Sequence, residues 1–105
     1  MRILFDHDTP RPLRRYLAEH VVDTAGEKGW AELRNGNLLD NAEGEGYEIM
    51  ITADQSIRYQ QNLEHRRIAI VVLLSNKWPD VRMSIEDIRA ALEGIQPGEL
   101  REVPI

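Results

Sequence analysis

The sequence predicts a three-layer α/β/α domain with a mostly parallel, five-stranded sheet. Short apolar runs without alternation, such as ILF at 3–5 and IAIVVLL at 68–74, are typical of strands buried on both faces. Segments with helical spacing of apolar residues lie between these runs, and such strand–helix alternation indicates a parallel α/β sheet. The 105 residues are enough for a single domain with one modest core, over residues 1–105.

The amino-terminal half should supply three strands and two helices. Thr9 can cap a first helix and Pro10 suits its first position, with an end near residue 19 or 20. Asn35 is the expected N-cap of a second helix, which stops at Gly44 or Gly46. The three strands are expected at residues 2–5, 21–25 and 47–52.

The carboxyl-terminal half should supply two further strands and two helices. Residues 56–64 are polar and predict a helix that covers little core, and residues 75–79 predict a loop. Ser84 and Asp87 have the spacing of a capping box that opens a last helix. The strands are expected at residues 68–74 and, at a sheet edge because of Pro104, at residues 100–105.

Composition excludes several kinds of site. The net charge of −5 argues against nucleic-acid binding driven by bulk charge, although a local basic patch is still compatible with it. The absence of cysteine excludes disulfides, thiolate zinc sites and thiol catalysis. The first apolar run is too short for a signal-peptide core, and no apolar stretch approaches about 18 residues. We therefore expect a cytoplasmic protein that does not enter the membrane.

Two expected strands stop at aspartates, and this is the main functional signal. Asp6 and Asp8 follow the first strand, and Asp54 follows the third. Ligands bind at the carboxyl ends of parallel strands, and three carboxylates in one small space require a cation or a proton. Carboxylate oxygens suit Mg²⁺ or Mn²⁺. The structural alternative is that these aspartates only cap the helices that follow, whereas His7 is expected to be structural or to face solvent.

Weaker candidates lie on the helices. Asn37 and Asp40 share a face of the second helix, so Asp40 could complete an acidic cluster if the amino end of that helix points into the cleft. Arg14, Arg58 and Tyr59 could hold phosphates and stack a base if they rim the cleft. The simpler interpretation of all five is a solvated surface.

Three stretches together resemble a known family. They are MRILFDHDTPRPLRRYL at the start, GWAELRNGNLL in the middle, and YEIMITADQSIRYQQNL followed by RRIAIVVL. The chain resembles, over nearly its whole length, small stand-alone PIN-like proteins related to VapC-type toxin ribonucleases. The resemblance implies a sheet ordered 3-2-1-4-5, binding of Mg²⁺ or Mn²⁺, and hydrolysis of phosphodiesters, usually in RNA. It also implies a small antitoxin-like protein partner and a homodimer.

The match to the family's acidic site is incomplete. By the resemblance, Asp6 is the first acid and Asp54 is the acid after the third strand, so these two would hold the metal. Asp8 stands where relatives often have asparagine or another polar residue, and it or Asp40 would orient the attacking water. Uncharged residues stand at two further acidic positions of the family. Asn37 replaces Asp or Glu, and Ser75 with Asn76 replaces the acid after the fourth strand. The resemblance therefore implies weak or lost activity.

Three other classes of protein share part of this pattern. A receiver-like phosphoacceptor domain also carries acids after its first and third strands and a hydroxyl after its fourth, as Ser75 would be, but its lysine after the last strand is missing here. FDHDT resembles the signature of haloacid-dehalogenase-like phosphatases, with the threonine one position too early. The third class is a non-catalytic PIN-like binding module, such as a toxin-like subunit held by an antitoxin.

Overall fold

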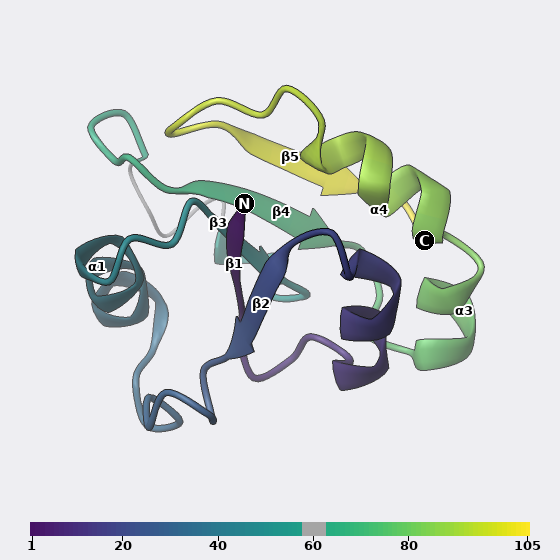
Figure 1. The fold of residues 1–105 in the computed structure, drawn as a ribbon, viewed down its shortest axis with the longest axis horizontal. Helices are drawn as coiled ribbons and strands as arrows, with labels where there is room; N and C mark the ends of the chain where they lie inside the picture. Colours follow the sequence, from purple (N-terminus) through teal and green to yellow (C-terminus); the bar gives the residue numbers. More distant parts are fainter. Residues whose placement is uncertain (58–62) are drawn as a thin grey trace.

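The computed structural model describes residues 1–57 and 63–105 and confirms an α/β fold with a parallel sheet. All four strand pairings in these residues are parallel, and the neighbours follow the order β2-β1-β3-β4-β5 (Figure 1). The strands are β1 (Arg2–Phe5), β2 (Val21–Thr24), β3 (Ile49–Thr52), β4 (Ala69–Leu73) and β5 (Leu100–Val103).

The expected strand order 3-2-1-4-5 is wrong, because β3 lies directly beside β1. Ile3 pairs with Ile49 and Phe5 with Ile51. All four residues of β3 are buried, as an interior strand requires, whereas β2 exposes 59% of Val21 and suits an edge. The winding of the sheet therefore reverses between β1 and β3, and not between β1 and β4.

Helices cover both faces of the sheet. The 3-10 helix η1 (Arg11–Leu17), α3 (Trp78–Arg82) and α4 (Ile85–Leu92) pack on one face, where they bury Leu13, Val81 and Ile88 against the odd-numbered residues of β1. Helix α1 (Asn35–Gly44) packs on the other face and buries Leu38 and Leu39 against Leu4. The alternation of side chains along β1 thus divides the core into two layers.

Several helix starts differ from the expectations. Thr9 caps nothing, because its hydroxyl reaches the Ile51 carbonyl at 2.6 Å, and the helix behind it is 3-10. Arg34, not Asn35, is the N-cap residue of α1. Ser84 precedes α4 without a side-chain cap, because its hydroxyl contacts the Asp80 carbonyl instead.

The expected loop at 75–79 ends inside α3, which places Trp78 5.9 Å from the Tyr16 ring and so anchors η1. The helix expected over residues 56–64 falls mostly on residues 58–62, which lie outside the described residues. No helix in the described part of the chain has the length and apolar character needed to cross a bilayer.

Gly98 offers a test of close packing at the start of β5. Its φ is 79°, and a Cβ there would lie 2.9 Å from the Leu63 carbonyl oxygen. Gly94 has a φ of 66°, but a Cβ at Gly94 would have no described atom within 4 Å. We expect Gly98→Ala to lower the free energy of unfolding by about 2–4 kcal/mol and Gly94→Ala by only about 1–2 kcal/mol. Urea denaturation measures both, and equal losses would contradict the role of the contact.

Candidate functional site

The carboxyl ends of β1 and β3 bring the two principal aspartates together. The Asp6 N–H donates to the Ile51 carbonyl at 3.2 Å, which extends the β1–β3 ladder by one residue. Asp6 then leaves the sheet beside Thr52, the last residue of β3. In open α/β sheets ligands bind where the strand order reverses, and this is that place.

One hydroxyl connects Asp6 with the backbone of Asp54. The Thr52 hydroxyl donates to Asp6 Oδ2 and accepts from the Asp54 N–H at 3.0 Å. Thr52 is fully buried, so both contacts are shielded from water. Asp54 Oδ1 in turn accepts from the N–H of Ser56 at 3.0 Å and from its hydroxyl at 2.6 Å. The capping interpretation of Asp54 therefore accounts for one of its oxygens.

The other oxygen of Asp6 is held by the loop after β1. Asp6 Oδ1 accepts from the Asp8 N–H at 3.1 Å and lies 3.0 Å from the Thr9 hydroxyl. That hydroxyl has one proton and also lies 2.6 Å from the Ile51 carbonyl, so it cannot donate fully to both. If Asp6 Oδ1 carried a proton, it could donate to the Thr9 hydroxyl oxygen, while the Thr9 hydroxyl donates to the Ile51 carbonyl.

Burial raises the pKa of Asp6 above its ordinary value. Hydrogen bonds from Thr52, Thr9 and the Asp8 N–H lower that pKa but do not offset the loss of water, and the Asp8 charge raises it further. A carboxyl group that is costly to ionise at a strand end is typical of functional sites, since a bound cation or proton would relieve the cost.

Two adjoining hollows share Asp6 and His7 as common walls. The larger, about 200 Å³, extends toward the end of β2, and Arg11 lines it. The smaller, about 90 Å³, extends toward α1 and contains Asp8, Asp54 and Arg34. The three aspartates predicted from the strand ends thus line one hollow, and an arginine lines the hollow on each side of Asp6.

The helical candidates lie elsewhere. Asp40 accepts from Arg66 at 2.8 Å and lines neither hollow, and Asn37 is exposed on α1 outside both. Arg14 pairs with Glu27 at 3.1 Å.

Of the four remaining candidates, two follow β4 in the sequence and two precede it. Ser75 accepts from the Lys77 N–H at 3.1 Å and Asn76 is exposed, and neither lines the hollows. Arg58 and Tyr59 lie outside the described residues.

Sequence reasoning missed four residues at this site. Arg11 and Arg34 are exposed and line the hollows, whereas Thr9 and Thr52 fix the orientation of Asp6. A usable signal for Thr52 was its position at the end of a buried strand, two residues before Asp54. His7 is exposed, as expected, with Nε2 3.2 Å from the Leu33 carbonyl.

Within residues 1–57 and 63–105, no group of three histidine, aspartate or glutamate side chains converges closely enough to hold a metal ion. Comparison of the chain with protein-family models, with curated proteins and with solved structures found no match. The arrangement of Asp6, Asp54 and the two arginines is therefore the basis for assigning a function.

The raised pKa of Asp6 predicts a specific dependence of stability on pH. The folded chain holds this proton more tightly than the unfolded chain, so the free energy of unfolding should fall as pH rises from about 3.8 through the raised pKa. Asp6→Asn removes the titration, and its stability relative to wild type should increase over that window and then level off. Urea midpoints across pH measure this, with Glu32→Gln as control, because Glu32 is an exposed carboxylate that lines neither hollow. A constant difference between Asp6→Asn and wild type would contradict the assignment.

Proposed function

We propose that this protein is a metal-dependent endoribonuclease that hydrolyses RNA phosphodiesters at the carboxyl ends of β1 and β3. One observation carries the proposal: Asp6 and Asp54 share a hollow at the point where the strand order reverses, linked through Thr52. The resemblance to PIN-like proteins, which comes from the sequence, points to the same chemistry, although the strand order β2-β1-β3-β4-β5 differs from the order that this resemblance implies.

The donor set fits a divalent cation held by few protein ligands. Asp6 and Asp54 offer hard carboxylate oxygens, which suit Mg²⁺ or Mn²⁺, and Asp8 lines the same hollow. Since no three acidic or histidine side chains converge in the described residues, water would complete the coordination. When bound, such a cation polarises the phosphate and makes nearby water more acidic. Its charge would also offset the cost of ionising Asp6.

The chain's own groups bind and orient the substrate. Arg11 lines the larger hollow and Arg34 the smaller, one on each side of Asp6, and arginine is well suited to phosphate oxygens. A strand of RNA lying along both hollows would place a phosphate over Asp6. Thr52 and Thr9 contact the two oxygens of Asp6 and so fix the orientation of its carboxyl group.

Asp8 is the group best placed to take a proton from the attacking water. Its side chain is exposed, lines the hollow of Asp54, and accepts no hydrogen bond from the described residues. In this scheme Asp40 has no part, because Arg66 holds it outside the hollows.

Cleavage and metal binding should depend on the same two residues. We expect Mn²⁺ to give heat on calorimetric titration with wild type, and Asp6→Asn with Asp54→Asn to lower both metal affinity and RNA cleavage by about 100-fold or more. Asp40→Asn, the matched control, should cleave as wild type does, and chelation of the metal should abolish cleavage. Cleavage that survives the double substitution, or a wild type that gives no heat with Mn²⁺, would refute the proposal.

The two arginines should determine RNA binding. Arg11→Ala and Arg34→Ala should each weaken binding of a single-stranded RNA and reduce the slope of log K against log salt by about 0.7. Fluorescence anisotropy over a salt series, with metal chelated, measures binding apart from cleavage. Arg14→Ala removes the same charge from a residue paired with Glu27, so it should have little effect. An equal loss in Arg14→Ala would show that bulk charge alone is responsible.

A phosphoacceptor domain is the second candidate, and the strand order favours it. The order β2-β1-β3-β4-β5 is that of flavodoxin-like and receiver domains, with Asp54 after the third strand. The lysine that receivers carry after the last strand is absent from residues 100–105. Acetyl phosphate separates the two candidates: an acid-labile phosphoryl group on Asp54 would support a receiver and contradict the nuclease.

A further inference from the structure

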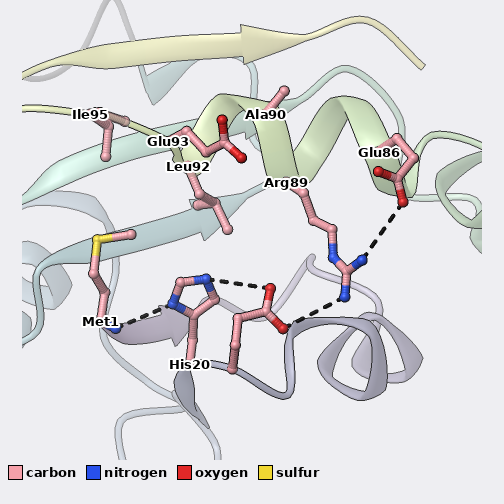
Figure 2. A pocket seen from close by; sticks show the side chains of 10 residues that line it. Met1, His20, Glu86, Arg89, Ala90, Leu92, Glu93 and Ile95 are labelled. Atoms are coloured by element: carbon pink, nitrogen blue, oxygen red, sulfur yellow. Dashed lines mark hydrogen bonds and ion pairs between the residues drawn. The ribbon is translucent and has the colours of Figure 1, made fainter.

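A large groove lies at the amino ends of the strands, opposite the aspartates. Met1, His20 and Glu48 immediately precede β1, β2 and β3, and the groove follows this edge. Its main part, about 890 Å³, lies between the start of the sheet and α4 (Figure 2). This volume is in the range of ligand pockets, about 300–1,000 Å³. None of the residues that line the aspartate hollows lines it.

The groove is elongated. A smaller hollow of about 90 Å³ shares Met1 and Ile95 with it and continues past Glu48 to Arg67 and Ala69, at the start of β4. The two together cross the starts of β2, β1, β3 and β4. Neighbouring strands lie about 4.8 Å apart, so the crossing is about 14 Å long, the length of about four residues of extended chain. A peptide fits this shape better than a compact metabolite does.

The rim of the groove is mainly acidic. Its carboxylates are those of Glu19, Glu48, Glu86 and Glu93, and its positive groups are the guanidiniums of Arg67 and Arg89 and the α-ammonium of Met1.

Arg89 is already engaged within the protein. Its Nε donates to the Tyr16 carbonyl at 3.1 Å, and its other nitrogens lie 3.6 Å from Glu19 and 3.7 Å from Glu86 (Figure 2). The Glu93 carboxylate has no partner among the described residues. Along α4 the charge available to a ligand is therefore negative, whereas Arg67 and the Met1 α-ammonium, which contacts His20 Nδ1 at 3.2 Å, are positive groups toward the far end of the groove.

The same edge exposes apolar surface. Only three large hydrophobic side chains of the described residues are exposed, and two of them, Met1 at 40% and Val21 at 59%, are neighbours here. The Val21 N–H donates to the Met1 carbonyl at 3.0 Å. The half-buried Ile95 adds apolar surface inside the groove, where Figure 2 shows it facing Met1, whereas Leu92 lines the groove but is only 2% exposed. Apolar side chains gathered beside a polar rim are a mark of an interaction surface.

We propose that this groove docks a basic, amphipathic peptide segment of a partner protein. The apolar side chains of the segment pack on Met1 and Ile95, and its lysines or arginines face Glu86 and Glu93. Charge complementarity favours a basic segment, because the glutamates along α4 would repel an acidic one. The inference does not depend on the function proposed for the opposite edge.

Synthetic peptides test the proposal on the full chain. The probe is a short extended peptide of alternating leucine and lysine, and its control replaces each lysine by glutamate. We expect the lysine peptide alone to bind, to shift backbone amide NMR signals at His20, Leu92 and Ile95, and to bind more weakly as salt rises. Glu86→Lys with Glu93→Lys should reduce its affinity about tenfold.

Glu32→Lys is the control variant, because it introduces a lysine at an exposed carboxylate outside the groove. It should leave the affinity close to that of wild type. An equal loss in Glu32→Lys, equal binding of the glutamate peptide, NMR shifts confined to Asp6 and Asp54, or no binding at all would each overturn the proposal. So would sedimentation showing a dimer that is disrupted by Glu93→Lys, since a second copy of the chain would then be the occupant.

Discussion

The contact between β1 and β3 is the constraint on which the rest of this structure depends. It places Phe5 beside Ile51 in register, so that Asp6 and Thr52 leave the sheet together. Because Thr52 is fully buried, its hydroxyl must find both a donor and an acceptor within the protein, and it finds them in the Asp54 N–H and the Asp6 carboxylate. A strand pairing made by apolar side chains thereby fixes the positions of two acidic residues.

The electrostatic consequences are concentrated on Asp6. Its burial raises its pKa, and three hydrogen-bond donors reduce that effect without removing it. A buried carboxyl group that is costly to ionise lowers the stability of the folded protein, and such groups are found at functional sites, where function is favoured over stability. The arginines in the adjoining hollows supply positive charge close by, although the chain as a whole carries a net charge of −5.

The two edges of the sheet differ in chemistry for a geometric reason. Parallel strands place all their carboxyl ends on one edge and all their amino ends on the other. One edge holds the aspartates between two arginines, and the other combines exposed apolar side chains with unpaired carboxylate charge.

The sequence alone determined the fold class, the five strands and the residues that follow them. Buried parallel strands lack alternation, and this pattern is readable in ILF and IAIVVLL. It also identified Asp6, Asp8 and Asp54, since strand ends are local features. Helix caps were less predictable, because the Thr9 and Ser84 hydroxyls found acceptors other than those that a local motif offers.

Only the tertiary structure decided the order of the strands. Each strand pairs through backbone groups that are the same in every residue, so a single sequence does not state which strand lies beside which. The burial of all of β3 and the exposure of Val21 decided it. That order brought Arg11 and Arg34 to the aspartates and left Asp40 with Arg66. Long-range packing decides which acidic residues come together in a site, and the local spacing of residues along the sequence does not encode that packing.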